Sequence, residues 1–223
     1  MIAEVLTTIS SGVSKRLEDH EGWDPDWSKG VFHGLLRCSS PKCAEPVVVV
    51  GEYRIDVAAQ SVESWRGGYV SLLRLRYAHP ALVLLDCPVR TPEAVRSAVA
   101  AASLLVWADP GAAANRLRLA TEELLTAQDV PPSAIVQGNN KRLHAHQRLE
   151  RLSARNSVAA EALMAVKWIG NEGSHTDALT VGDVLDGAEM LGSALRALYD
   201  TSDEEVRRLV RETNNAKGVL KGR

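Results

Sequence analysis

Residues 159–180 read AAEALMAVKWIGNEGSHTDALT and decide the fold of the second half of the chain. Large apolar residues at helical spacing (Leu163, Val166 and Ile169) predict a helix that is buried along one side. Gly170 is expected to end this helix as its C′ residue. A polar loop and a new helix start follow, so the stretch is predicted to join two helices of a bundle.

The segments on either side of this stretch also carry helix signals. Thr91 and Asp109 each precede a proline, which is typical of an N-cap followed by the first helical residue. Thr180 begins a capping-box pattern with an Asp in place of the usual Glu. A loop is expected before residues 141–151, which are themselves expected to be helical. Residues 91–200 are therefore predicted to form an antiparallel bundle of four or five helices.

The first part of the chain favours strands. Residues 2–17 place apolar side chains at four-residue steps and predict a short amphipathic helix. Alternation over residues 69–77 predicts Leu75 and Tyr77 on one face of a strand. Short apolar runs separated by turn residues predict four strands in all: residues 31–37, 46–53, 69–77 and 81–85. The predicted class is α+β, with a β-rich region over 1–90, a helical bundle over 91–200 and a charged helix and tail over 201–223.

Composition excludes several classes of protein. The chain has 223 residues and a formal net charge of −2, so no overall basic field indicates nucleic-acid binding. No stretch predicts a signal peptide or a membrane span. Three cysteines in a chain of this length favour a reducing compartment. We expect a cytoplasmic protein without membrane contact.

The cysteines raise the question of a metal. Cys38 and Cys43 bracket a C-x4-C turn of the kind that presents two thiolates to a tetrahedral zinc. A complete site needs two further ligands, for which Cys87, His33 and His79 are the candidates. The alternatives are one structural zinc held by this turn, as in a zinc knuckle, or no cofactor and a degenerate turn held by the strands.

The most basic local surface is predicted on residues 141–151. Lys141, Arg142, Arg148 and Arg151 lie away from the apolar side of the expected helix. A solvated face is the plainer interpretation. Contact with the phosphates of RNA or DNA is the alternative.

Three segments together resemble a known family. They are AVAAASLLVWADPGAAANRLRLATEELL, LHAHQRLERL and LMAVKWIGNEGSH, in this order. They resemble domain of unknown function 4145, which is similar to the HEPN helical superfamily. The most specific element is Gly170, Asn171 and His175 in the pattern GN-x-x-x-H. Members often carry an N-terminal zinc-ribbon-like region, which the C-x4-C turn resembles.

The resemblance implies a candidate site. HEPN ribonucleases use an arginine, a polar residue and a histidine, usually assembled across a dimer. Here His175 matches the acid or base and Asn171 the polar residue. Gly170 stands where the arginine is expected, so Lys167 or Arg118 is the candidate phosphate ligand.

A structural interpretation of the same residues stands beside the catalytic one. It assigns them to a polar cluster that locks the bundle: Arg118, Glu122, Asn171 and His175. With it we predict a non-catalytic interaction or regulatory module, dimeric or bound to a protein partner, in a bacterial or phage defence or mobile-element system. The alternatives are a metal-independent HEPN-type endoribonuclease and a nucleic-acid-binding accessory protein.

Overall fold

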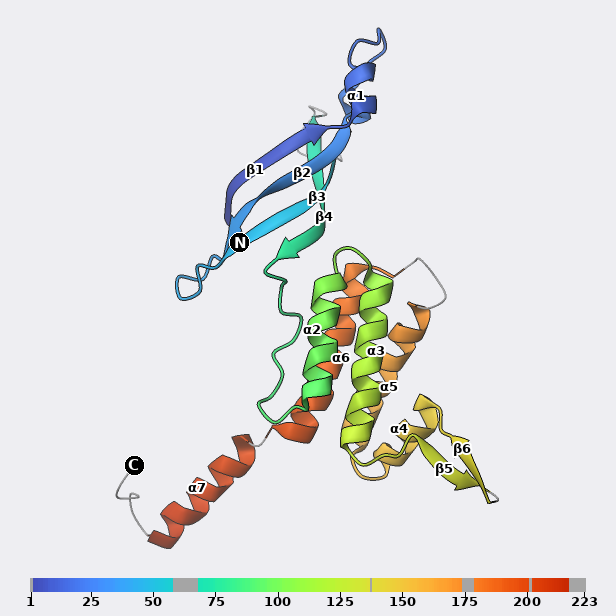
Figure 1. Ribbon diagram of the computed structural model, residues 1–223. Helices are drawn as coiled ribbons and strands as arrows, with labels where there is room; N and C mark the ends of the chain where they lie inside the picture. Colours follow the sequence, from blue (N-terminus) through green and yellow to red (C-terminus); the bar gives the residue numbers. More distant parts are fainter. Residues whose placement is uncertain (1, 58–67, 137, 174–178, 201, 217–223) are drawn as a thin grey trace. The chain divides into compact units, whose positions relative to one another are not determined.

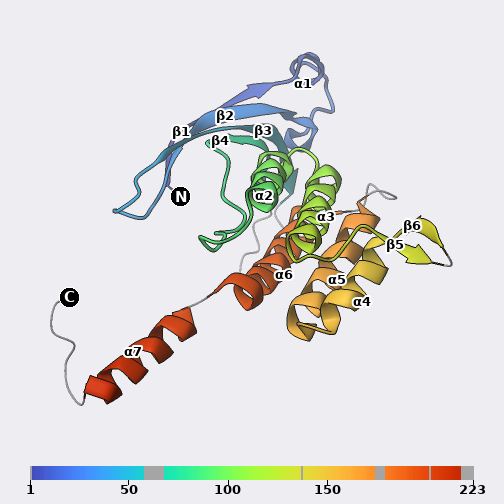
Figure 2. The same ribbon diagram turned by 60° about the horizontal axis from the view of Figure 1, so that its bottom comes forward.

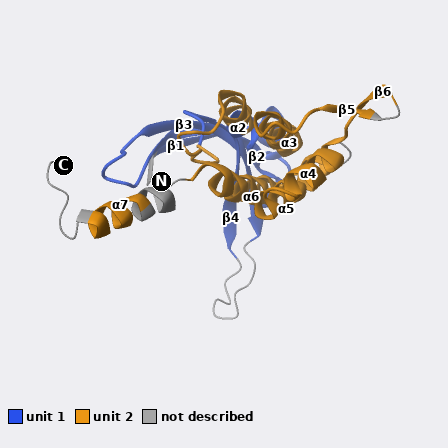
Figure 3. Cartoon of the chain, turned by 90° about the horizontal axis from the view of Figure 1, so that it is seen from below, with its two compact units in different colours: residues 1–82, 103–109 blue, residues 83–102, 110–223 orange. Residues whose placement is uncertain are grey.

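The chain divides into two compact units, which Figure 3 shows in different colours. The first unit contains residues 1–82 and 103–109, and the second contains residues 83–102 and 110–223. The predicted α+β class is confirmed, because an antiparallel sheet is followed by helices. The computed structural model describes residues 2–57, 68–136, 138–173, 179–200 and 202–216.

The first unit is built on a four-stranded antiparallel sheet in which each strand pairs with the next along the chain (Figure 1). A short helix, α1 (Gly12–Leu17), and a 3-10 turn, η1 (Pro25–Trp27), lie in the first connection. The strands are β1 (Ile2–Ser10), β2 (Lys29–Arg37), β3 (Pro46–Val57) and β4 (Tyr69–His79).

One face of this sheet is buried and the other is exposed. Val47, Val49 and Tyr53 alternate along β3 and are at most 8% exposed. Phe32 joins them from β2, and Trp107 packs against this cluster. The intervening positions point to the opposite face. Aliphatic side chains on that face are between 41% and 50% exposed: Val31, Val48, Val50 and Leu72.

The N-terminal helix predicted over residues 2–17 is wrong. Residues 2–10 form β1, and only residues 12–17 are helical. β-branched residues fill this stretch, among them Thr7, Thr8 and Ile9, and such residues fit a pleated strand better than a helix. Pairing with β2 then supplies the backbone hydrogen bonds.

Two further predictions about the strands are wrong. Residues 81–85 form no strand within the described chain. A bulge lies between Val50 and Gly51 in the pairing of β3 with β4. Because of it, Leu75 pairs with Gly51 on the buried face, whereas Tyr77 pairs with Val50 on the exposed face. The prediction that Leu75 and Tyr77 share a face is therefore wrong.

The second unit is helical. Helices α3, α5 and α6 lie side by side, and α4 packs against α5 (Figures 1 and 2). A two-stranded hairpin, β5 (Ser133–Val136) and β6 (Asn139–Arg142), precedes α4. The helices are α2 (Glu93–Leu105, in this unit up to residue 102), α3 (Pro110–Ala127), α4 (Ala145–Ser153), α5 (Ser157–Glu172), α6 (Val181–Tyr199) and α7 (Ser202–Ala216).

Leucines build the core of the helical unit. Their side chains are at most 1% exposed and come from four different helices: Leu117, Leu124, Leu125, Leu149, Leu152, Leu163, Leu191 and Leu195. Because these leucines are closely packed, adding or removing a single carbon atom in this core would shift the helices or destabilise the unit. Among the described helices, none combines the length and the apolar character that crossing a membrane requires.

The helix predicted over residues 141–151 begins later than expected. Lys141 and Arg142 lie in β6, and α4 starts only at Ala145. The expected long loop is instead the β5–β6 hairpin. Gly138, in its turn, has φ +78°, a left-handed conformation that glycine adopts without strain.

Candidate functional site

Gly170 lies inside a helix rather than at its end. α5 continues to Glu172, and Gly173 is its C-cap residue. A Cβ atom added to Gly170 would lie 2.5 Å from Arg118 Cβ and 3.1 Å from the Ala114 carbonyl oxygen. A Cβ atom essentially never comes within 3.0 Å of a heavy atom of another, non-adjacent residue. The prediction that Gly170 ends the helix is therefore wrong, because this glycine instead lets α5 approach α3.

Arg118 fills the space beside Gly170. Its Nη1 atom donates a hydrogen bond to Glu122 Oε1 over 3.3 Å, one turn further along α3. The two side chains are 37% and 31% exposed, so solvent weakens this ion pair. The guanidinium group nevertheless has an anionic partner. Arg118 of α3 is therefore the cation that lies beside Gly170, and it is paired with the Glu122 carboxylate.

The end of α5 is attached to the start of α3. The side-chain amide of Asn115 donates a hydrogen bond to the Gly173 carbonyl oxygen over 3.4 Å. A Cβ atom on Gly173 would lie 2.7 Å from the Gly111 carbonyl oxygen. The two predicted residues nearby are placed differently: Asn171 is half-buried in the last turn of α5, whereas His175 lies outside the described residues.

The Lys167 side chain contacts an aromatic ring. Its Nζ atom lies 3.4 Å from the centre of the Trp168 ring, in a cation–π contact. Trp168 is 57% exposed, and the His146 ring of α4 lies 6.5 Å from it, centre to centre. His146 Nδ1 also lies 3.3 Å from the Met164 sulfur atom. We call Met164, Lys167, Trp168 and His146 the Trp168 patch.

Sequence reasoning missed the Trp168 patch. The signal that was available is the spacing of Met164 and Trp168, which at i, i+4 lie on one side of a helix. The ring of His146 comes from another helix, and only the packing of α4 on α5 brings it near.

Arg148 lies in the interior and not on the basic surface. Its side chain is 4% exposed. Its guanidinium group donates hydrogen bonds to the Val130 carbonyl oxygen (2.7 Å), the Thr126 hydroxyl (2.9 Å) and the Glu122 carbonyl oxygen (3.3 Å). Burial lowers the pKa of Arg148 from its usual value, and the Glu122 carboxylate opposes this shift. Arg148 therefore ties α4 to the end of α3 and to the loop that follows.

The other three basic candidates are exposed. Lys141 and Arg142 lie on β6, and Arg151 lies near the end of α4. The basic surface predicted on one helix is thus divided between a hairpin and a helix, and Arg148 does not belong to it.

The metal-ligand candidates are separated along the chain. Cys38 and Cys43 lie in the turn after β2, and a hydrogen bond from the Ser40 backbone and one from the Cys43 thiol hold the pKa of Cys38 below its usual value. His33 lies within β2, and Cys87 belongs to the second unit. Within the described residues, no group of three His, Cys, Asp or Glu side chains converges on one point. A structural zinc stays a prediction, which metal analysis of the purified protein tests.

Comparison with known families identifies the helical part. The chain belongs to the family described as domain of unknown function DUF4145, whose model matches residues 100–215. A second model, domain of unknown function DUF8608, matches residues 2–77. No curated protein and no solved structure matches the chain. The predicted resemblance to domain of unknown function 4145 is confirmed.

Proposed function

We propose that this protein is a non-catalytic interaction or regulatory module with a HEPN-like helical bundle, and that it acts by binding protein, including a second copy of itself. One observation carries the proposal: both cations of the candidate catalytic set are engaged elsewhere. Arg118 is paired with Glu122, and the Lys167 ammonium lies over the Trp168 ring. A bacterial or phage defence or mobile-element setting rests on the family resemblance alone.

The engaged cations count against an endoribonuclease. A phosphate ligand has to meet its substrate with a free guanidinium or ammonium group, because the charge that develops in the transition state has to be offset. The Glu122 carboxylate already offsets the charge of Arg118, to which it is bonded at one nitrogen, and Gly170 has no side chain to supply a second cation. The packing of α5 on α3 leaves no room for a larger residue at that position.

The Trp168 patch is the surface that we propose for partner binding. Tryptophan is enriched at the energetic centres of protein interfaces because it buries a large apolar area when a partner covers it. Trp168 is 57% exposed, with a histidine ring from α4 nearby and a lysine ammonium over its face. A partner that covers the indole would bury its apolar surface together with the Lys167 side chain that lies over it.

The experiment compares two exposed apolar residues of the second unit. Val89 is 92% exposed and lies outside the Trp168 patch, so Val89→Asp controls for the added charge. Tagged full-length chains are purified from the native host, and the mass and stoichiometry of each complex are measured. We expect a stoichiometric protein complex, homodimer included, that Trp168→Asp disrupts and Val89→Asp leaves intact. A monomer without a stoichiometric partner, or a complex that is indifferent to Trp168→Asp, refutes the proposal.

A further inference from the structure

A groove crosses the sheet of the first unit, with a volume of about 780 Å³. This volume falls within the range of small-molecule sites. Gly30, Tyr53 and Leu73 pair across β2, β3 and β4 and form its middle row. In antiparallel strands, side chains of one cross-strand row point to the same face, and those of the next rows to the other face. The middle row therefore offers its backbone as the floor of the groove on the exposed face.

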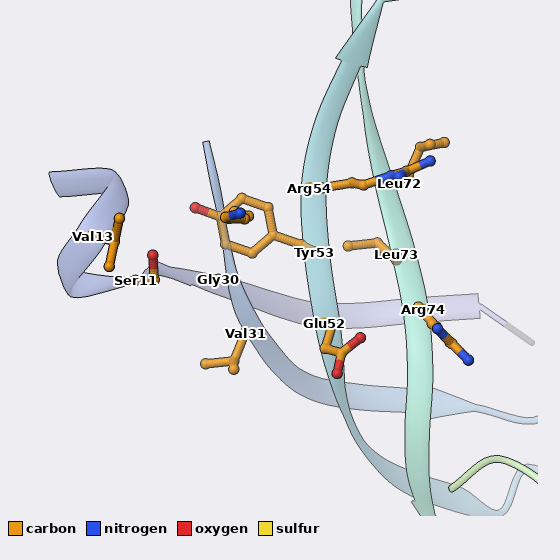
Figure 4. Close-up of a pocket in the computed structure, with 11 residues that line it drawn as sticks. Ser11, Val13, Gly30, Val31, Glu52, Tyr53, Arg54, Leu72, Leu73 and Arg74 are labelled. Atoms are coloured by element: carbon orange, nitrogen blue, oxygen red, sulfur yellow. The ribbon is translucent and has the colours of Figure 1, made fainter. Parts of the chain in front are cut away.

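The rows on either side are the walls. Lys29, Arg54 and Leu72 pair across the three strands in one wall. The opposite wall is the row Val31, Glu52 and Arg74. Figure 4 shows these levels along β3 and β4, with Arg54 and Leu72 on one side of Tyr53 and with Glu52 and Arg74 on the other.

The dimensions follow from sheet geometry. Rows two residues apart are separated by about 7 Å, and the two spacings between β2, β3 and β4 add up to about 10 Å. Val13 of α1 lies at one end of the groove and is 52% exposed. Together with Val31 and Leu72 it gives the groove an aliphatic lining that no aromatic side chain interrupts on the walls. A narrow, flexible aliphatic chain fits this space.

The charges are unbalanced. The groove residues include three cations, Lys29, Arg54 and Arg74, and one carboxylate, Glu52, for a net charge of 3 − 1 = +2, in a chain whose overall charge is −2. Glu52 forms an ion pair with Arg76 over 3.1 Å, and Arg76 does not belong to the groove lining. Within the described chain, neither Lys29 nor Arg74 takes part in an ion pair.

Lys29 and Arg54 are direct cross-strand partners. Like charges opposite each other destabilise a sheet. Arg54 has Asp56 at 3.1 Å, but both side chains are largely exposed, which weakens that pair. A bound anion between Lys29 and Arg54 would remove the repulsion.

We propose that this groove binds a free amphiphilic anion, with an aliphatic tail along the floor and an anionic head between Lys29 and Arg54. The charge complementarity of the groove selects an anion, and its aliphatic lining selects an acyl-type tail. This inference goes beyond the proposed protein-binding function and does not depend on it, since the two surfaces lie in different units.

Calorimetric titration of the full chain with dodecanoate, below the concentration at which it forms micelles, tests the proposal. We expect one site with a dissociation constant on the order of 0.1 mM, which is reasonable for a ligand of this size. Dodecyltrimethylammonium, whose alkyl tail is one carbon longer and whose charge is opposite, is expected to bind at least tenfold more weakly. Raising the salt concentration should weaken dodecanoate binding.

Two variants locate the site. Lys29→Glu replaces a like-charge pair by an ion pair with Arg54, so the sheet should keep or gain thermal stability while dodecanoate binding falls at least tenfold. Leu72→Asp places a charge on the wall and should have the same effect on binding. The controls are Arg116→Glu and Val89→Asp, which change exposed residues of the second unit.

Three results would overturn the proposal. The first is the absence of dodecanoate binding to the wild-type chain. The second is equal binding of the cationic amphiphile, or binding that Lys29→Glu and Arg116→Glu change alike. The third is binding to phosphatidylglycerol vesicles without binding to monomeric dodecanoate, which would assign the groove to a membrane surface instead.

Discussion

Replacing Gly170 by alanine tests the close approach of α5 to α3. The added Cβ would lie 2.5 Å from Arg118 Cβ and 3.2 Å from Arg118 Cδ. The nearest atom belongs to the root of a side chain and cannot rotate away, so the helices must separate. Overpacking costs about 1–3 kcal/mol, and a contact of 2.5 Å with an atom next to the backbone belongs to the upper part of that range, about 2–3 kcal/mol. Alanine regains about 1 kcal/mol of helix propensity, which leaves a net loss of about 1–2 kcal/mol.

Gly187→Ala is the matched control. Gly187 lies within α6, and its added Cβ would be 3.4 Å from Leu117 Cδ1 and 3.5 Å from Ile169 Cδ1, which are ordinary contacts. Here the gain in helix propensity is not opposed, so stability should rise by up to about 1 kcal/mol. The same chemical change is thus expected to have opposite signs at two glycines of neighbouring helices.

Urea denaturation followed by far-UV circular dichroism measures both variants. A double-mutant cycle with Arg118→Gly, which removes the opposing Cβ, should recover about 1–2 kcal/mol of the loss at Gly170. The reasoning is refuted if Gly170→Ala is as stable as the wild-type chain, or if Arg118→Gly and Gly170→Ala add without coupling.

Three further predictions concern Arg148, the Thr180–Asp183 cap of α6 and the cysteines. Arg148→Met should lower the free energy of unfolding by about 3 kcal/mol, because buried acceptors lose a charged donor, as urea denaturation will show. Thr180→Ala should cost about 1 kcal/mol through the lost helix cap. Hydrogen bonds from Thr180 lower the pKa of Asp183 in the folded chain. The stability that Asp183 contributes is therefore complete above the usual pKa of an aspartate and is lost as the pH falls through the lower pKa of the folded state. Asp183→Asn should remove this part of the acid dependence of the melting temperature. Cys38 should be alkylated by iodoacetamide before Cys87, because hydrogen bonds lower the pKa of Cys38, whereas burial raises that of Cys87.

Each of these predictions has a result that contradicts it. A loss below about 1 kcal/mol for Arg148→Met would mean that solvent replaces the guanidinium at its acceptors. If the melting temperature of Asp183→Asn falls at low pH as much as that of the wild-type chain, other carboxylates determine this acid dependence. Peptide mass spectrometry measures the rate of alkylation at each cysteine. If Cys87 is alkylated faster than Cys38, the access of the reagent to the sulfur decides the order, and not the fraction of thiolate.

The helix starts were predictable because their signals are local. The proline after Asp109 correctly marks the start of α3, and Thr180 accepts the backbone hydrogen bond from Asp183 that an N-cap should accept. These patterns depend on neighbours within one turn, and the sequence contains all of them.

The role of Gly170 was not predictable from its neighbours. A glycine near the end of an apolar helical run has the signature of a C′ residue. What decides its role is the Cβ of Arg118, which lies 52 residues earlier in the chain. Arg148 was misplaced for a similar reason, since its acceptors lie in α3 and the following loop, and its position in a basic run gave no sign of them.

The sheet errors have a different cause. Apolar residues four apart, such as Val5 and Ile9, share a face in a strand as well as in a helix, so spacing alone did not separate the two. The bulge beside Gly51 shifts Tyr77 to the other face by one residue, and a bulge has no reliable sequence signature. The groove depends on the register of three strands and therefore appears only in the folded sheet.

An RNA-cleavage assay on the full chain tests the non-catalytic assignment most directly. Wild type, His175→Ala and Arg118→Ala are purified in parallel and incubated with labelled single-stranded RNA, with and without a metal chelator. Because Arg118 and Lys167 are engaged by Glu122 and Trp168, we predict no cleavage above buffer by any of the three. The non-catalytic assignment would be contradicted if the wild-type chain cleaves the RNA and His175→Ala, with an unchanged melting temperature, does not.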